Sequence, residues 1–144
     1  MTDAQAYLQW LDRSGRLANA RFCSEHEWER AARGADDRTY PHGDWLAPAD
    51  ANFDRTYARE FVAMGPDPVG SYPQSQSPFE VFDMAGNVFD LTVKPTDPEV
   101  PAFRGGGYFF EGITLWTVNR WVGGPSFRES AIGLRVCASV PSRP

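Results

Sequence analysis

Apolar residues recur at helical spacing near the start of the chain. Between Ala4 and Leu11 they fall three or four residues apart, which places them on one face of a helix. Gly15 follows the segment and is a common helix stop. The pattern therefore predicts a short amphipathic helix over residues 2–14.

A second helical segment follows a brief apolar run. The letters ARF at residues 20–22 are typical of a short strand. Ser24 and Glu27 then have the spacing of a capping box, in which each side chain bonds the other residue's backbone N–H. Gly34 fits the glycine that often ends a helix. We expect a helix that begins after Ser24 and ends at Gly34.

The middle and the end of the chain differ in pattern. Residues 40–77 are dominated by Pro, Gly and Asp, which predicts a long loop held by packed aromatic side chains. The last third alternates short β-branched or aromatic runs with glycine, as antiparallel sheets do. Those runs are FEVFDM (79–84), NVFDLTV (87–93), AFRGGGYFF (102–110) and AIGLRVCASV (131–140).

The chain has the size and composition of one domain. Its 144 residues suffice for one hydrophobic core, and 13 glycines with 12 prolines indicate much turn and loop. Two helices followed by a small sheet give an α+β fold class. We therefore expect a single α+β domain over residues 1–144 with extensive irregular loops.

Charge and hydropathy limit the kinds of partner. A net charge of −5 and a single lysine, Lys94, argue against a nucleic-acid surface, which needs clustered basic residues. No apolar run approaches the ~20 residues of a membrane-spanning helix, and the N-terminus lacks the shape of a signal peptide. A cytoplasmic protein without a membrane span is expected, unless the chain is part of a longer one.

The cysteines and histidines form no recognisable motif. Cys23 and Cys137 are too few for a zinc site, and we interpret them as buried thiols on strands, with a disulfide as the alternative. His26 is expected on an exposed helix face and His42 in a turn. Neither histidine has a partner at a spacing that indicates catalysis.

Two carboxylates bracket a Gly-Asn turn in the stretch DMAGNVFD. Calcium prefers six to eight oxygen ligands from carboxylates and from carbonyls of a sharply turning chain. Asp83 and Asp90 supply the carboxylates, and Gly86 and Val88 the carbonyls. The alternative is a turn in which Asp90 bonds neighbouring backbone groups without a metal.

Several motifs in order resemble the formylglycine-generating enzyme family, also called sulfatase-modifying factors. RFCSEHEWERAARG is similar to the family's R-L-P-T-E-A-E-W-E-x-A-A-R-G, and YPHGD to its Y-P-W-G-D. PVGSYPQSQSPFEVFDMAGNVFDLT is similar to a family segment that ends in D-M-x-G-N-V-W-E-W-T. FRGGGY and IGLRV resemble R-G-G-S-W and G-F-R. The resemblance covers roughly residues 3–138.

The resemblance implies a fold and a calcium site. The family has a C-type-lectin-like fold with little regular secondary structure. Its calcium ligands match Asp83, Gly86, Val88 and Asp90, with Asp90 where the family usually has Glu. A second family site matches Asn52 and the Phe53 carbonyl. The later loop, EFVAMG, lacks the Asp that this second site needs.

The family's catalytic residues are missing. Formylglycine-generating enzymes use copper held by two cysteines after the R-G-G motif, and those positions fall on Phe110 and Leu115. Neither side chain can ligate Cu(I). The iron-dependent relatives need a His-rich site that His26 and His42 cannot make. We therefore predict no copper and no catalysis by the family's routes.

The chain begins at the helix that follows the family's G-G-x-F-x-M-G motif. The fold is then trimmed, or a partner chain or fused segment completes it, or the sequence is a fragment. All three alternatives remain open at the level of sequence.

The segment between R-G-G and the last strand has the composition of a binding surface. Residues 108–127 hold six aromatic residues with small and polar ones between them. Leu115 and Trp116 are expected in the core. The candidate ligand-binding residues are Tyr108, Phe109, Phe110, Glu111, Asn119, Trp121 and Phe127.

These features predict a non-catalytic binding module for an unknown protein or small-molecule ligand. Within the resemblance, it matches either a variable protein diversified by a retroelement or a sensor domain associated with bacterial signalling proteins. The alternative is a degenerate or divergent oxidoreductase. A cluster of Cys, His or acidic residues near Phe110 would favour the enzyme.

Overall fold

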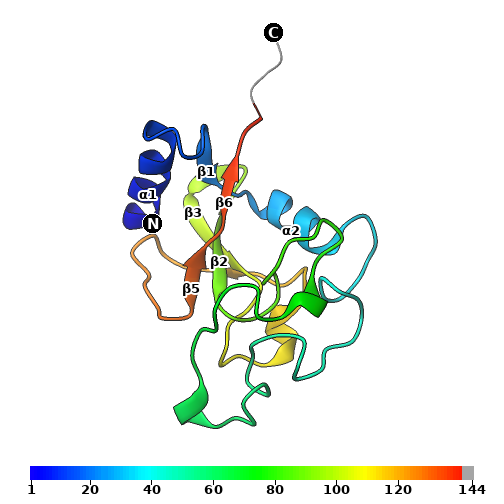
Figure 1. Ribbon diagram of the computed structural model, residues 1–144. Coiled ribbons are helices and arrows are strands. Elements are labelled where there is room, and N and C mark those ends of the chain that lie inside the picture. Colours follow the sequence, from blue (N-terminus) through cyan, green and yellow to red (C-terminus); the bar gives the residue numbers. More distant parts are fainter. Residues whose placement is uncertain (141–144) are drawn as a thin grey trace.

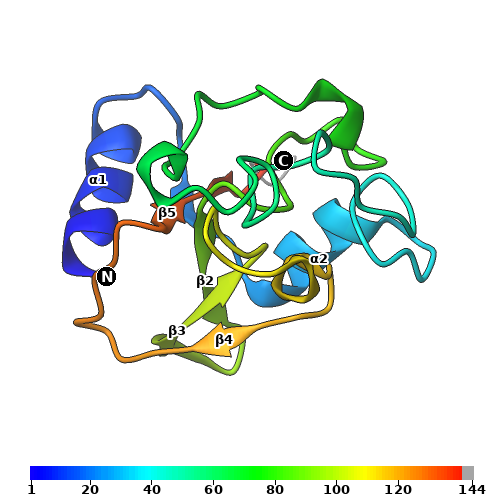
Figure 2. The same cartoon turned by 90° about the horizontal axis from the view of Figure 1, so that it is seen from below.

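The computed structural model describes residues 1–140, which form two helices, six strands and long connecting loops. The helices lie on opposite sides of the central strands (Figures 1 and 2). The α-helices and strands are α1 (Thr2–Arg13), β1 (Ala20–Phe22), α2 (Glu25–Arg33), β2 (Phe89–Lys94), β3 (Asp97–Arg104), β4 (Trp121–Val122), β5 (Ile132–Leu134) and β6 (Val136–Ala138). Three 3-10 turns lie in the loops, at Phe61–Ala63 (η1), Pro73–Ser75 (η2) and Gly112–Leu115 (η3).

Both predicted helices are confirmed, and α2 begins with the expected capping box. The Ser24 hydroxyl accepts the Glu27 backbone N–H at 3.2 Å, and the Glu27 carboxylate accepts the Ser24 N–H at 2.9 Å. Gly34 follows the helix with φ +71°, a conformation that favours glycine. Trp28, on the inner face of α2, is 1 % exposed and fixes the helix to the sheet.

The main sheet has the strand order β4-β3-β2-β5 (Figure 2). Strands β2 and β3 pair antiparallel, with Leu91 opposite Phe103. The expected small sheet is therefore present, and one of its pairings is parallel, because β5 runs in the same direction as β2. A second, two-stranded sheet joins β1 to β6.

The predicted strand at residues 79–84 is absent from the structure, where this segment is irregular. Glu80 and Asp83 have φ values of +60° and +55°, which a strand cannot contain. The Ser77 hydroxyl accepts the backbone N–H of Val81 at 3.3 Å and holds the chain in a turn. Two of the apolar side chains that suggested a strand pack against α2 instead. Met84 is fully buried there, and Val81 is partly buried.

The interpretation of the two cysteines as thiols is wrong, because Cys23 and Cys137 form a disulfide. Antiparallel pairing of β1 with β6 sets Arg21 opposite Cys137, so Cys23 comes close to the last strand. The two Cα atoms are 4.9 Å apart. This pairing of the first and last strands is a tertiary contact that neither local pattern revealed.

Aromatic packing and one half-buried acid anchor the long loop. Tyr40 and Phe53 enter a core cluster with Leu115, as the sequence predicts. Asp67 then accepts hydrogen bonds from the hydroxyls of Tyr57 and Tyr72, at 2.7 and 2.6 Å. These bonds tie three points of the loop together. The hydrogen bond to Asp67 raises the pKa of Tyr57; for Tyr72, burial and then the same carboxylate raise it.

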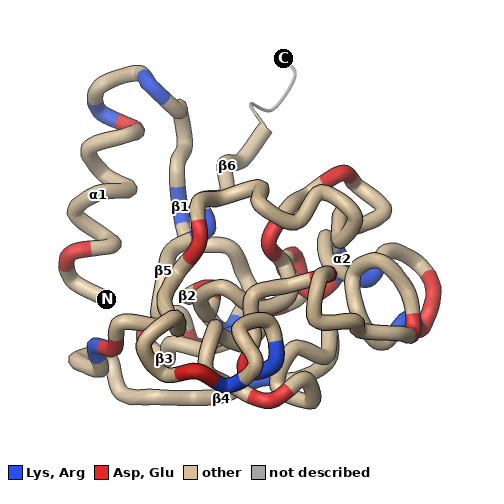
Figure 3. The backbone as a smooth tube through the Cα atoms, turned by 60° about the horizontal axis from the view of Figure 1, so that its bottom comes forward, with Lys and Arg blue, Asp and Glu red and all other residues tan. Residues whose placement is uncertain are grey.

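Acidic and basic residues are interspersed along the described chain (Figure 3). Ion pairs link many of them, including Arg21 with Glu27 and Arg33 with Glu29. His26 is exposed on α2, and His42 lies in the turn that Tyr40 and Gly43 close, both as expected. Neither helix of residues 1–140 has the length and apolar composition that a membrane crossing requires.

Candidate ligand-binding site

The candidate site begins where a glycine turn ends β3. Gly105 and Gly106 have φ values of +90° and +77°, which redirect the chain after Arg104. A Cβ atom on Gly106 would lie 2.6 Å from a methyl carbon of Leu115, so only glycine lets the chain pass there. The turn brings residues 108–111 back across the end of β2.

Five aromatic side chains from four parts of the chain surround one hollow, which we call the aromatic cup. Its volume is about 450 Å³, within the range of small-molecule sites. Ring centroids lie 5.1 Å apart for Phe89 and Phe110, and 4.6 Å apart for Trp121 and Phe127. The cup is lined by Phe89, Phe109, Phe110, Thr114, Asn119, Arg120, Trp121, Phe127, Glu129, Ala131 and Ile132.

The rings form a buried floor and an exposed wall. Phe89, on β2, is 7 % exposed, whereas Phe109, Trp121 and Phe127 are 38 %, 41 % and 39 % exposed. Aromatic side chains held at such intermediate exposure around a hollow present apolar surface that a ligand can still cover. The cup therefore offers aromatic contact area that folding leaves uncovered.

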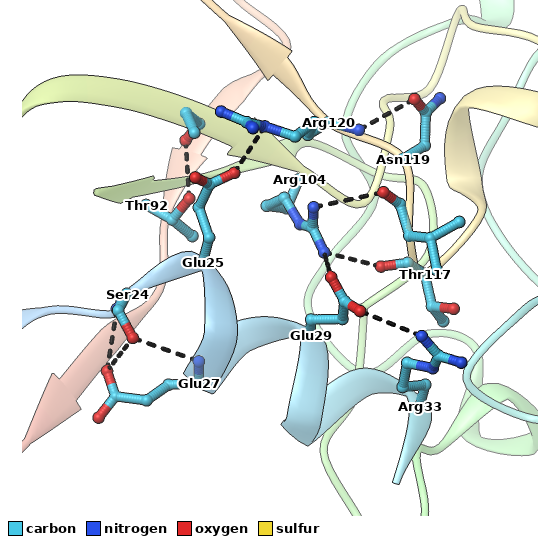
Figure 4. A network of polar contacts seen from close by, with 12 residues as sticks. Ser24, Glu25, Glu27, Glu29, Arg33, Thr92, Arg104, Thr117, Asn119 and Arg120 are labelled. Atoms are coloured by element: carbon cyan, nitrogen blue, oxygen red, sulfur yellow. Dashed lines mark hydrogen bonds and ion pairs between the residues drawn. The ribbon is translucent and has the colours of Figure 1, made fainter. Parts of the chain in front are cut away.

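Polar contacts fix the rim of the cup. The Asn119 side chain donates to the Ile113 carbonyl at 3.2 Å and accepts the Arg120 backbone N–H at 2.9 Å. The Arg120 guanidinium pairs with Glu25 of α2 at 2.8 Å (Figure 4). Because Glu25 is buried, this pair ties the rim to the second helix.

A buried arginine supports the same segment from below. Arg104, 2 % exposed, donates to the Thr117 carbonyl at 2.9 Å and to Glu29 at 2.6 Å (Figure 4). Burial opposes ionisation of Glu29, but hydrogen bonds from Arg104 and Arg33 outweigh it, so the pKa of Glu29 is lowered. The ionised Glu29 therefore pairs with Arg104 and holds the segment that leads from η3 to β4.

The predicted binding residues divide between two places. The structure brings five of them to the cup: Phe109, Phe110, Asn119, Trp121 and Phe127. Tyr108 lies beside it, with its ring centroid 5.0 Å from that of Phe109. Glu111 lines a neighbouring cleft instead.

One of the two residues expected in the core is misplaced. Leu115 is fully buried, as predicted, but Trp116 is 40 % exposed. The 3-10 turn η3 ends between them, so consecutive side chains point to different sides. Sequence reasoning also missed six cup residues, although Phe89 stands in the NVFD motif, Ile132 in IGLRV, and Thr114 and Arg120 within residues 108–127. They are Phe89, Thr114, Arg120, Glu129, Ala131 and Ile132.

The copper-binding positions of the family do not fit a copper ion here. Phe110 belongs to the cup, and Leu115 is fully buried in the core cluster around Phe53. The sequence has only two cysteines, and their disulfide leaves no thiolate. Residues 1–140 also hold no group of three His, Cys, Asp or Glu side chains arranged for a metal.

The acidic turn presents two carboxylates to one hollow. Gly86 and Asn87 form its tight turn, with φ values of +76° and +64°. Asp83 and Asp90 line the hollow together with Val88. One Asp90 oxygen accepts both the Trp28 indole N–H and the Arg135 guanidinium, each at 2.7 Å.

The residues around this hollow fit a calcium ion in part. The second oxygen of Asp90 and one oxygen of Asp83 receive no hydrogen bond from residues 1–140, and Val88 lines the same hollow. Arg135 already supplies one positive charge and also donates to the Asp83 carbonyl at 3.2 Å. Gly86, the fourth predicted ligand, does not line the hollow. Calcium at Asp83 and Asp90 stays a prediction.

Comparison with known proteins decides the family. The model of the sulfatase-modifying factor enzyme 1-like domain matches residues 1–140. The chain belongs to this family. The predicted resemblance is therefore confirmed.

Two curated relatives differ in what their names say about activity. A formylglycine-generating enzyme of Mycobacterium tuberculosis is 35 % identical over 98 residues, which cover 62 % of this chain and 30 % of the relative. An inactive C-alpha-formylglycine-generating enzyme 2 of Bos taurus is 30 % identical over 115 residues, covering 74 % and 36 %. The chain thus spans about a third of the length of these relatives.

Solved structures confirm the C-type-lectin-like fold class. PvdO from Pseudomonas aeruginosa aligns with a TM-score of 0.78 at 25 % identity, covering 96 % of this chain and 59 % of that one. Treponema denticola variable protein 1 aligns with a TM-score of 0.65 at 20 % identity, covering 81 % and 46 %. The second likeness concerns the fold alone.

Proposed function

We propose that this domain is a non-catalytic binding module and that the aromatic cup is its ligand-binding site. The observation that carries the proposal is the replacement of a catalytic position by part of the cup. Phe110 stands where the family has a copper ligand, and its ring packs on Phe89 at the floor of the hollow. A position that holds a metal ligand in catalytic relatives here carries one of the rings of the cup.

The ligand that fits the cup carries an aromatic or bulky apolar group. Five rings line the hollow, and stacked or edge-to-face contacts between rings add about 0.5–1.5 kcal/mol each beyond area burial. Asn119 at the rim is already engaged by local hydrogen bonds, which leaves few polar groups to select the ligand. The group belongs either to a small molecule or to a side chain of a partner protein.

The relatives also bear on which class of binding protein this domain belongs to. A relative named inactive supports a family member without catalysis, and a variable protein shares the fold. Residues 108–127 enter from a glycine turn and reach β4 through loops, so exposed positions can change with little effect on the core. We favour a diversified variable protein or a signalling-associated sensor over a degenerate oxidoreductase.

The proposal is tested by calorimetric titration with indole, a minimal aromatic probe. We expect wild-type protein to bind indole measurably. The double substitution Phe110→Ala with Trp121→Ala should abolish binding, because it removes one floor ring and one wall ring. Wild-type protein that does not bind indole, or a folded double variant that binds as tightly, would overturn the proposal.

A matched control distinguishes binding at the cup from nonspecific binding to exposed aromatic side chains. Phe61 is an aromatic residue 87 % exposed in η1 and outside the cup. Phe61→Ala should therefore leave indole binding unchanged. A thermal melt of each variant shows whether the fold is intact, because truncated core aromatics cost roughly 3–5 kcal/mol and partly exposed ones less.

A further inference from the structure

A second hollow lies between the long loop and η3, and we call it the tryptophan cleft. Its volume is about 480 Å³, and it shares no lining residue with the aromatic cup. Residues 40–59 form one side and residues 111–116 the other. The residues used below are Asp44, Trp45, Asp54, Arg59, Glu111 and Trp116.

A buried carboxylate with a free oxygen lines this cleft. Asp54 is 6 % exposed, and its backbone N–H donates to the Phe110 carbonyl at 3.1 Å. One carboxylate oxygen accepts from Arg59 at 2.8–2.9 Å. The other oxygen is buried and receives no donor from residues 1–140. Buried acceptors are nearly always paired with the protein or with ordered water, so this oxygen calls for a donor that a water or a ligand supplies.

Two indole rings border the same cleft. Trp45 is 88 % exposed, and Trp116 is 40 % exposed. The Trp116 indole N–H donates to the Tyr40 hydroxyl at 3.1 Å, which fixes the orientation of its ring. Both indoles line the cleft that the Asp54 carboxylate also lines, and they give it apolar surface. Such a surface is costly to leave in water and is typical of binding sites.

The charges of the cleft nearly balance. Asp44, Asp54 and Glu111 are opposed by Arg55 and Arg59. Arg59 already pairs with Asp54, and Asp44 accepts the Thr39 backbone N–H at 2.9 Å. A strongly charged ligand would leave the cleft side chains of like charge without a partner. A neutral polar ligand can accept hydrogen bonds from the arginines and donate them to the carboxylates.

We propose that the tryptophan cleft binds a neutral saccharide. A pyranose has an apolar C–H face that can pack on an indole, and its hydroxyl groups both donate and accept hydrogen bonds. A hydroxyl supplies the donor that the free oxygen of Asp54 lacks, while Arg55 donates to other hydroxyls. This site is separate from the aromatic cup, so the result of testing one proposal does not decide the other.

The test is a glycan array that carries neutral and charged saccharides, probed with purified protein. We expect wild-type protein to bind at least one neutral glycan, with a Kd measured afterwards by titration. Trp45→Ala and Asp54→Asn should each weaken that Kd at least tenfold. Trp45→Ala keeps the test decisive even if Asp54→Asn impairs folding, because Trp45 is almost fully exposed.

Two controls define the outcomes. Trp10→Ala removes another partly exposed tryptophan, on α1, and should leave glycan binding intact, as should Phe110→Ala with Trp121→Ala. Binding that is lost only in that double variant would place the saccharide in the cup and overturn the proposal. Failure to bind any neutral glycan, or preference for charged glycans alone, would also overturn it.

Discussion

Asp90 is paired with a cation that the chain itself supplies. The two acids around a tight turn predict something positive between them, and the structure supplies Arg135, 45 residues away between β5 and β6. The local motif identifies the acids but not this arginine, because β5 and β6 return to β2 only in the folded chain. The remaining carboxylate oxygens of Asp83 and Asp90 keep calcium as a testable second cation.

Calcium should raise the melting temperature of the protein, and EDTA should lower it. An ion that binds only the folded state stabilises it by mass action, by about 2.7 kcal/mol at a hundred times its Kd. Differential scanning calorimetry with each addition measures the shift. Asp83→Asn is the matched variant, because it keeps an oxygen for the Gly70 N–H but loses the charge. Identical melting of wild-type protein with calcium and with EDTA would remove the site.

Phe110 and Leu115 predict that the protein does not oxidise a substrate cysteine. Copper-dependent oxidation needs thiolate ligands, and hydrocarbon side chains occupy both positions. The assay follows conversion of a cysteine-containing sulfatase peptide with Cu(I) and oxygen. Formylglycine above the level of a protein-free control would show that catalysis takes another route.

The division of residues 108–127 could be predicted only in part. Composition correctly pointed to a segment that gathers aromatic side chains. It could not decide which of two neighbours faces the core, as Leu115 and Trp116 illustrate, because that depends on the 3-10 turn that Gly106 accommodates. Glu111, which precedes this turn, lines the neighbouring cleft and not the cup.

At the level of elements, sequence motifs predicted structure most reliably where nearby residues pair the backbone hydrogen-bonding groups of the same element. The capping box and Gly34 define both ends of α2, and both are visible in the sequence. Residues 79–84 show the opposite case. Their aromatic and β-branched content is typical of a strand, but left-handed backbone at Glu80 and Asp83 forbids one. Neither residue type announces such a conformation.

The capping box should contribute measurably to stability. Ser24→Ala removes the hydroxyl that accepts the Glu27 N–H, and we expect a loss of about 1 kcal/mol in the free energy of unfolding. Urea denaturation at neutral pH measures it. A loss near zero would mean that water replaces the hydroxyl without cost.

Glu27 adds a pH dependence to the same helix end. Hydrogen bonds from Arg21 first, and from Ser24, lower its pKa from 4.5 to about 2. A lowered pKa adds stability above pH 4.5 that is lost as pH falls toward 2. The stability difference between wild-type protein and Glu27→Gln should therefore shrink over this range. A difference that stays constant with pH would contradict the assignment.

Across the whole molecule, the disulfide joins the two ends of the fold. Cys23 follows β1 and Cys137 lies in β6. The bond therefore links the two ends of the chain segment that contains α2 and the main sheet. Disulfides persist mainly in oxidising compartments, and the cytoplasmic setting stays a prediction. The pairing could not be predicted, since it depends on strands 114 residues apart in sequence.

Breaking this bond should destabilise the protein strongly. Replacing both cysteines with serine removes a constraint on the unfolded chain, and losses of roughly 2–5 kcal/mol are typical. Thermal melts of the double variant, and of wild-type protein with and without reductant, measure the effect. The double variant should also be insensitive to reductant. Unchanged melting of wild-type protein after complete reduction would contradict this role.

The aromatic cup likewise forms only when segments distant in the sequence come together in the fold. Its rings come from β2, from the turn after β3, from β4 and from the loop before β5. The sequence identified four of the five rings within one segment. It missed Phe89 because strand pairing, and not chain proximity, brings that residue beneath Phe110.

The most direct test of the cup is an amide NMR titration of ¹⁵N-labelled protein with indole. We expect the largest shift changes at residues that line the cup, such as Thr114, Asn119, Ala131 and Ile132. The same titration of the folded variant with Phe110→Ala and Trp121→Ala should leave these signals unmoved. Shift changes confined to other surfaces, or equal changes in the double variant, would contradict the binding role assigned to the cup.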